Sequence, residues 1–394
     1  MSGDATFPSV WARLRDAIEE WVGTFGDLLR TRFSRDAVRY HELGVQAYEK
    51  GDKPGALEYL KRANQYAPGD PLFASDLGQV YYELGEFNEA EGKFRSVLKA
   101  SHSDPRALKG LAYALHAQRK LSEAVPIYLR FLANNGDETD ALVSLGGALE
   151  DLGDHQQAID FYLRAKELDP HNEMIFGNLG RTMYAVGRLS EAAQILREAI
   201  EQYPNNADFQ NLLALTLEAQ GDTEQAIATY RASLEQNPKD LRARISISRL
   251  LDSEGKHLEA VREAQSTLKA LEQGGDKDAL AQAYGNLGWY FYECEDWKQS
   301  IEASRRALES DPQLYSVRFN LGLALLHDGA VREALEEYER GANDVSSPRE
   351  LRYWAIEDLK EAAVKRPALD GVGDVLELLA SKEKKLEMSV KAAR

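Results

Sequence analysis

The stretch Thr139–Asn172, TDALVSLGGALEDLGDHQQAIDFYLRAKELDPHN, decides the fold of this chain. Its first half places leucines three and four residues apart, at Leu142, Leu145 and Leu149. Gly153 interrupts this spacing, and small or apolar residues resume it before Pro170, at Ala158, Tyr162 and Ala165. Such spacing is typical of one face of a helix, and glycine and proline commonly end helices. The stretch therefore predicts a helix, a turn and a second, antiparallel helix.

The same offsets recur in nine copies along the chain. The copies span 37–70, 71–104, 105–138, 139–172, 173–206, 207–240, 241–280, 281–314 and 315–348. The eighth position of every copy is small, at Gly44, Gly78, Ala112, Gly146, Gly180, Ala214, Ser248, Gly288 and Gly322. The twentieth position is also small, at Ala56, Ala90, Ala124, Ala158, Ala192, Ala226, Ala260, Ser300 and Ala334. Because only small side chains let two helix backbones approach closely, we expect the helices of each copy to cross at these positions.

The turn between the two helices carries glycine in most copies, at Gly51, Gly85, Gly153, Gly187, Gly221, Gly255 and Gly329. Arg119 and Glu295 stand at this offset in the other two copies. In its period and in its small, aromatic and proline positions, the pattern resembles the tetratricopeptide repeat. The resemblance implies an all-α fold, a right-handed α-solenoid in which each unit contacts its neighbours. It also implies that the first helices of the repeats line a concave groove.

Segments outside the copies complete the expected architecture, with an N-terminal amphipathic helix in 1–36 and capping helices in 349–394. The N-terminal helix is expected over Ser9–Phe33. Its apolar residues fall mainly three and four apart and include Trp11, Leu14, Ile18, Trp21 and Phe25. A stripe of this width needs a partner. Three partners remain open: the solenoid of the same or a second copy, which would give a homo-oligomer, another protein, or a membrane surface.

Two further expectations concern the C-terminal half. In the seventh copy, residues 271–279 add six residues around two glycines, which predicts a longer loop and a bend between 37–270 and 281–348. After the ninth copy, Pro348 is expected to open a capping helix. The apolar stripe of that helix is Tyr353, Ile356, Leu359 and Val364. A second capping helix is expected from Asp370, with its end fraying from Lys382 onward.

Composition excludes several classes of function. The net charge of −17 argues against a nucleic acid partner, because an acidic body repels phosphate backbones. The single Cys294 excludes a disulfide framework, and the histidines show no paired metal-ligand spacing. There is no phosphate-binding glycine loop, because the repeat accounts for the glycines in its turns and crossings. We therefore expect no enzymatic activity, no cofactor and no metal. The sequence shows neither a secretory signal nor an 18-residue apolar run, so the expected location is the cytoplasm.

The candidate partner site is the groove that the resemblance implies. In the family, helix positions 2, 5, 6, 9, 12 and 13 of each copy line it. Asparagines at position 6 can both donate to and accept from a peptide backbone. Aromatic side chains and an arginine at positions 9 and 12 are typical of interfaces. The expected partner-binding residues are Tyr82, Tyr113, Asn178, Arg181, Tyr184, Asn286, Trp289, Tyr292 and Asn320. The sequence thus predicts a scaffold or adaptor that binds a peptide or helix; the alternative is a peripheral membrane adaptor that uses Ser9–Phe33.

Overall fold

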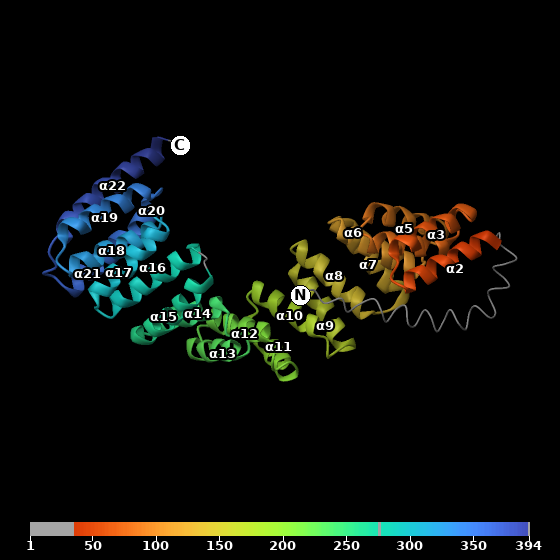
Figure 1. Ribbon diagram of the computed structural model, residues 1–394, viewed down its shortest axis with the longest axis horizontal. Coiled ribbons are helices and arrows are strands. Elements are labelled where there is room, and N and C mark those ends of the chain that lie inside the picture. Colours follow the sequence, from red (N-terminus) through yellow and green to blue (C-terminus); the bar gives the residue numbers. More distant parts are fainter. Residues whose placement is uncertain (1–34, 275–276, 393–394) are drawn as a thin grey trace. The chain divides into compact units, whose positions relative to one another are not determined.

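The computed structural model describes residues 35–274 and 277–392 of the chain (Figure 1). Within these ranges every regular element is a helix. The expected N-terminal helix, Ser9–Phe33, lies outside the described residues, and so do its apolar residues Trp11, Leu14, Ile18, Trp21 and Phe25. The chain forms two compact units, unit 1 ending at Gln202 and unit 2 beginning at Tyr203.

Both units are built from antiparallel helix pairs. Unit 1 contains α2 (Arg35–Glu49), α3 (Lys53–Tyr66), α4 (Pro71–Glu83), α5 (Phe87–Ala100), α6 (Pro105–Ala117), α7 (Leu121–Asn135), α8 (Thr139–Asp151), α9 (His155–Leu168), α10 (Glu173–Ala185) and α11 (Leu189–Gln202). Unit 2 contains α12 (Ala207–Gln220), α13 (Thr223–Gln236), α14 (Leu241–Ser253), α15 (His257–Gly274), α16 (Lys277–Glu293), α17 (Trp297–Ser310), α18 (Tyr315–His327) and α19 (Val331–Asp344). The second helix of each pair packs against the first helix of the next pair in the same unit, as in an α-solenoid.

The two helices of a pair cross at the small residues that the sequence singled out. A Cβ atom on Gly146 would lie 2.5 Å from Cε1 of Tyr162, and one on Gly180 would lie 2.7 Å from Cδ2 of Leu196. The residues at the twentieth position are fully buried at Ala56, Ala90, Ala124, Ala158, Ala192, Ala226, Ala260, Ser300 and Ala334. The expected all-α solenoid is therefore confirmed together with the crossing points that produce it.

The turns between paired helices share one backbone conformation. All seven turn glycines have positive φ, between 73° at Gly255 and 85° at Gly153. Arg119 and Glu295 adopt the same region, with φ of 61° and 59°. The left-handed conformation strains a residue that has a Cβ atom, so the fold imposes this turn even where the sequence lacks glycine.

Polar residues replace the usual apolar residue at the fourth position of three first helices in unit 2. Each donates a hydrogen bond to the carbonyl of a proline six residues earlier. The pairs are Gln210 with Pro204 (3.3 Å), Arg244 with Pro238 (3.0 Å) and Arg318 with Pro312 (2.7 Å). Arg318 also donates to Glu337 on the second helix of its pair, at 2.9 Å. These side chains satisfy the loop carbonyls and so compensate for the burial of polar groups.

The expected loop in the seventh copy is wrong. Helix α15 continues to Gly274 and α16 begins at Lys277, so they have 18 and 17 residues. The extra residues lengthen two helices because Leu268 and Leu271 extend the buried face of α15. The division into two compact units falls after Gln202 and does not test the expected bend between 37–270 and 281–348, which stays a prediction.

The segment after α19 forms a cap on unit 2. It contains α20 (Pro348–Leu351), the π-helical turn η1 (Arg352–Ile356), α21 (Glu357–Lys365) and α22 (Val372–Ala392). The buried stripe of the first three is Leu351, Ala355, Ile356, Leu359 and Ala362. Tyr353 and Val364, which the sequence placed on this stripe, are 66% and 79% exposed. The π-turn inserts an extra residue and rotates the following helix, a register change that a 3.6-residue period does not anticipate.

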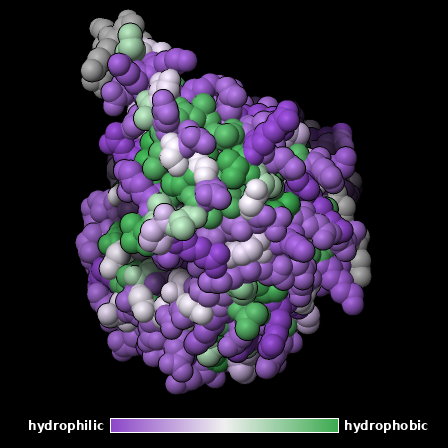
Figure 2. All heavy atoms as spheres, turned by 90° about the vertical axis from the view of Figure 1, so that its left-hand side faces the viewer, coloured by the Kyte–Doolittle hydropathy of each residue, from purple (hydrophilic) through white to green (hydrophobic). Residues whose placement is uncertain are grey.

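The cap covers the first helix of the ninth copy. Leu323 and Leu326 on α18 are each 2% exposed and belong to the hydrophobic cluster that the cap completes. Helix α22 packs against α19 and remains helical to Ala392, so the predicted fraying from Lys382 is wrong. On the side of unit 2 that carries the cap, hydrophobic residues form patches among hydrophilic ones (Figure 2).

Candidate functional site

We define the first-helix face as positions 2, 5, 6, 9, 12 and 13 of the first helix of each copy. In unit 1 these helices are α2, α4, α6, α8 and α10, and in unit 2 they are α12, α14, α16 and α18. Position 12 of one copy contacts positions 9 and 13 of the next. The contacts include Glu150 with Arg181 (3.5 Å), Asp252 with Trp289 (3.2 Å), His116 with Asp151 (4.0 Å) and Tyr292 with His327 (3.1 Å). The face therefore consists of side-chain rows that run from repeat to repeat within each unit.

The early part of the unit 1 face is tied together by charged groups. His41 lies 2.7 Å from Asp76, and the other oxygen of Asp76 lies 3.6 Å from Arg106. Lys109 pairs with Glu138 at the end of the same copy. Each basic group on this part of the face thus already has an acidic neighbour within unit 1.

Two predicted tyrosines join an aromatic cluster. The rings of Tyr82 and Tyr113 lie 6.3 Å apart, and Tyr113 meets the buried Tyr128 edge-on at 5.7 Å. His116 Nδ1 lies 3.3 Å from the Tyr128 hydroxyl. Burial raises the pKa of Tyr82 and Tyr113, so both phenols stay protonated at neutral pH. Tyr82 and Tyr113 are half-buried and keep part of their rings accessible.

The last two copies of unit 1 bring the predicted residues of α10 against α8. Asn178 accepts a hydrogen bond from Arg181 at 2.8 Å, and Arg181 also approaches Glu150. The Tyr162 hydroxyl donates to Glu150 at 3.0 Å from the second helix of the copy. Arg181 is exposed, whereas Asn178 and Tyr184 are half-buried. This region combines a carboxylate, a guanidinium, an amide and an accessible phenol.

In unit 2 the predicted aromatic pair is engaged within the fold. Trp289 stacks on Tyr292 at 5.4 Å and donates to Asp252. Tyr292 contacts His327, which stacks on Trp297 at 4.3 Å. Burial, followed by Glu293 and Asp358, raises the pKa of Tyr292. The sequence analysis did not identify Asp252, His327 or Trp297 as neighbours of this pair. Asp252 is at position 12 of the preceding copy and contacts Trp289 at position 9, and His327 is at position 13 of the following copy and contacts Tyr292 at position 12.

The other two predicted asparagines, Asn286 on α16 and Asn320 on α18, are half-buried on the same face.

Helix α21 places Asp358 within electrostatic reach of Glu293 at the end of α16. Burial, then Glu361, Glu293 and Glu357, raises the pKa of Asp358 to about 6. Burial also raises the pKa of Glu293. Unit 2 therefore concentrates negative charge around Asp358 and Glu293, beside the cap.

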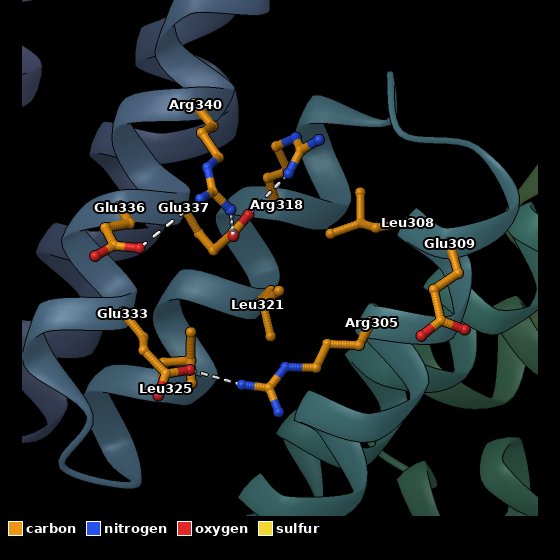
Figure 3. A pocket seen from close by; sticks show the side chains of 10 residues that line it. All are labelled: Arg305, Leu308, Glu309, Arg318, Leu321, Leu325, Glu333, Glu336, Glu337 and Arg340. Carbon is orange, nitrogen blue, oxygen red and sulfur yellow. Dashed lines mark hydrogen bonds and ion pairs between the residues drawn. The ribbon is translucent and has the colours of Figure 1, made fainter.

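A separate pocket of about 430 Å³ lies between α17, α18 and α19 (Figure 3). Its apolar lining is Leu308, Leu321 and Leu325. Its arginines all form ion pairs with glutamates at the pocket: Arg305 with Glu333 (2.7 Å), Arg318 with Glu337 (2.9 Å) and Arg340 with Glu337 (2.6 Å). Because these guanidinium groups are compensated, the pocket is a weaker candidate for a charged ligand than the first-helix face.

Two observations on the described residues bear on metal binding and on nucleophilic chemistry. Residues 35–274 and 277–392 contain no group of three or more histidine, cysteine or acidic side chains placed to hold a metal. Burial, then Asp252, Asp296 and Glu293, raises the pKa of the Cys294 thiol, which disfavours the nucleophilic thiolate. Over the same ranges, no helix has the length and apolar character needed to span a bilayer.

Known proteins resemble this chain in its repeats and fold. The structure of YrrB, a TPR protein with an unusual peptide-binding site, is 20% identical, covers 48% of this chain and 97% of its own, and has a TM-score of 0.44. MamA from Desulfovibrio magneticus RS-1 is 22% identical over 44% of this chain and 97% of its own, with a TM-score of 0.42. Another MamA structure is 23% identical over 44% and 94%, with a TM-score of 0.41. No curated protein matches the sequence.

The sequence profile of one family matches most of the chain. Its matches cover residues 75–138, 111–173, 178–240, 212–279 and 286–348. These segments include the crossing residues Gly146 and Ala158 and the turn glycines from Gly85 to Gly329. With helix pairs, crossing points and turns all following one period, the chain belongs to the tetratricopeptide repeat family.

Proposed function

We propose that the protein is a non-enzymatic interaction scaffold that binds an extended peptide of a partner along the first-helix face of unit 1. The supporting observation is the set of partly exposed aromatic and polar side chains that this face presents along successive repeats. Tyr82, Tyr113, Asn178 and Tyr184 belong to it and come from three different repeats. Accessible aromatic rings supply contact area at low entropic cost, and amides can bond a peptide backbone.

Unit 1 is the better candidate because the corresponding surface of unit 2 is partly used by the fold. The cap buries Leu323 and Leu326, which occupy positions 9 and 12 of α18. Trp289 and Tyr292 contact Asp252 and His327. A partner reaching these rings would compete with contacts within the chain, whereas Tyr184 of unit 1 is accessible without such a rearrangement. Asn286, Trp289, Tyr292 and Asn320 form a secondary surface in this proposal.

The test begins with a phage-displayed library of random dodecapeptides selected on the full-length protein. A selected peptide is then synthesised and titrated against variants. We expect Tyr184→Ala and Asn178→Ala to weaken binding by about tenfold or more, as the loss of interface anchors does. Arg197→Ala, an exposed residue on the second helix α11, serves as the control and should bind normally. Failure to select a peptide, or binding unaffected by both face variants, would contradict the proposal.

A second candidate function rests on Ser9–Phe33. Its apolar stripe includes Trp11 and Trp21, and Arg30, Arg32 and Arg35 follow toward its end. Tryptophan and arginine together favour the interface of an anionic bilayer. Flotation with phosphatidylserine-containing liposomes should bring up the full-length protein and leave behind a protein that starts at Asp36. If both stay in the soluble fraction, the membrane role is excluded.

A further inference from the structure

One place on the unit 1 face interrupts the rows of side chains. Position 9 of the fourth copy is Gly147, where other copies carry Gln79, Tyr113 or Arg181. The nearest side-chain atoms to an ideal Cβ at this site are the Tyr162 hydroxyl at 3.7 Å and His116 Cε1 at 3.9 Å. Gly147 is half-buried in the middle of α8. The face therefore has a gap between the position 9 residues Tyr113 and Arg181.

Helix packing does not account for this glycine. The adjacent Gly146 is required, since its Cβ would lie 2.5 Å from the Tyr162 ring. A side chain on Gly147 would make only ordinary contacts. A glycine inside a helix costs about 0.5–1 kcal/mol relative to alanine. The close approach of a ligand backbone is one of the uses that offset this cost.

The two groups that border the gap are each linked to a carboxylate. The Tyr162 hydroxyl donates to Glu150 at 3.0 Å, and His116 Nε2 lies 4.0 Å from Asp151. Burial lowers the pKa of His116 more than Asp151 raises it, so the imidazole is neutral at pH 7 and adds no positive charge. A group entering the gap therefore meets a phenol oxygen, a neutral imidazole edge and two carboxylates.

The unit 1 face as a whole also carries a net negative charge. The acidic residues at its positions in unit 1 are Glu42, Glu49, Asp76, Glu83, Asp140, Glu150 and Asp151. The basic residues are Arg106, Lys109 and Arg181, which gives seven acids against three bases. Arg119 and Arg181, which pair with Asp151 and Glu150, have side chains that are 66% and 57% exposed. Exposed ion pairs contribute only about 0–1 kcal/mol, so an incoming cation can replace these partners.

We infer that the gap at Gly147 is the specificity pocket of the unit 1 face and receives a lysine or arginine side chain of an extended peptide. The peptide backbone crosses α8 where Gly147 leaves room for it. The basic group lies between Tyr162 and His116 and pairs with Glu150 and Asp151. This inference rests on the proposed function and names the chemistry of its partner.

The test uses the dodecapeptides selected on the full-length protein. We expect a lysine or arginine at one fixed position of the selected sequences. Gly147→Leu fills the gap without touching the helix crossing and should weaken binding of the selected peptide by tenfold or more. Gly92→Leu is the matched control, because Gly92 is an exposed helical glycine on α5 with nothing within 4 Å of its Cβ position. It should leave binding unchanged.

A second pair of variants tests the charge. The double variant Glu150→Gln, Asp151→Asn should bind the basic peptide severalfold more weakly. Its affinity for a copy of the peptide with norleucine at the basic position should not be reduced. If Tyr184→Ala abolishes binding while Gly147→Leu and the charge variant do not, the specificity pocket is wrong and the peptide-binding function stands. If the selected peptides lack a fixed basic residue, the chemistry assigned to the gap is wrong. If no peptide is selected, both proposals fail.

Discussion

The guanidinium of Arg366 lies 2.9 Å from the carboxylate of Glu295, which is 71 residues earlier in the chain. The same group stacks over the ring of Trp297 at 5.1 Å. Arg366 directly follows α21, Glu295 lies in the turn between α16 and α17, and Trp297 is the first residue of α17. The cap is therefore attached to the eighth copy as well as to the ninth, on which it packs.

Replacing Arg366 should loosen this attachment. An exposed ion pair and a cation–π contact each contribute up to about 1 kcal/mol, so Arg366→Ala should destabilise the cap by about 1 kcal/mol. Hydrogen exchange measured by mass spectrometry should increase in α21 and in the α16–α17 turn. Arg366→Lys keeps the charge but stacks less well, and should show an intermediate effect. Unchanged exchange in Arg366→Ala would show that the cap is held by its hydrophobic contacts alone.

The carboxyl group of Asp358 should make the cap sensitive to pH. Burial and neighbouring glutamates raise the pKa of Asp358 to about 6, so its ionised form is disfavoured in the folded protein. The penalty is present in full above pH 6, falls as the pH is lowered from 6 toward 4, and vanishes below the unfolded-state pKa of 3.8, where the carboxyl is protonated in both states. Asp358→Asn should therefore raise the stability of unit 2 by about 1 kcal/mol at pH 8 and change little at pH 4. Thermal unfolding followed by circular dichroism at both pH values measures this, and equal shifts at the two values would contradict it.

Glu91 should have the opposite pH dependence. Although burial pushes the pKa of Glu91 upward, hydrogen bonds from Lys120, Arg95 and Gln118 lower it to about 2. The bonds from Lys120 and Gln118 join α5 to the turn between α6 and α7, whereas the bond from Arg95 lies within α5. The stabilisation is complete above about pH 4.5 and is lost as the pH falls toward 2. Glu91→Gln should lower the free energy of unfolding by about 1–2 kcal/mol at pH 7, and this free energy should then fall less steeply with decreasing pH than in the wild type. Urea titrations between pH 3 and 7 measure this. A variant whose free energy of unfolding falls as steeply as that of the wild type would refute this role.

Substituting the two neighbouring glycines of α8 should have opposite effects on stability, because Gly146 lies at the helix crossing and Gly147 does not. Gly146→Ala places a Cβ 2.5 Å from the Tyr162 ring and should destabilise unit 1 by about 1–3 kcal/mol. Gly147→Ala meets only ordinary contacts and improves helix propensity, so it should raise stability by about 0.5–1 kcal/mol. Chemical denaturation of both variants measures the difference. Similar stabilities would mean that the crossing at Gly146 can relax.

The repeat period made most of the fold predictable. It located the crossing residues and the turns, because these features depend on offsets that recur in every copy. At Arg119 and Glu295 it gave the place of the turn, and the structure shows the left-handed conformation that these residues adopt there.

Features that occur once escaped prediction. The π-turn at Arg352–Ile356 changes the helical register, which exposed Tyr353 and buried Ala355 instead. One recurring feature also escaped prediction: Trp289 engages Asp252 because position 12 of one copy lies against position 9 of the next, as Glu150 lies against Arg181. The period within a copy does not define how successive copies align. The cap itself was predicted, and the helix that it covers carries a matching signal, since Leu323 and Leu326 are apolar at positions that elsewhere carry mostly polar or aromatic residues.

The covered face of α18 also limits how this protein can lengthen in evolution. A duplicated repeat placed after α19 would have to displace the cap and would leave Leu323 and Leu326 facing a neighbour built for different residues. A duplication upstream of Tyr315 would meet ordinary repeat surfaces on both sides. Growth of the array by tandem duplication is therefore expected at internal positions, so that the cap keeps its place next to the ninth copy.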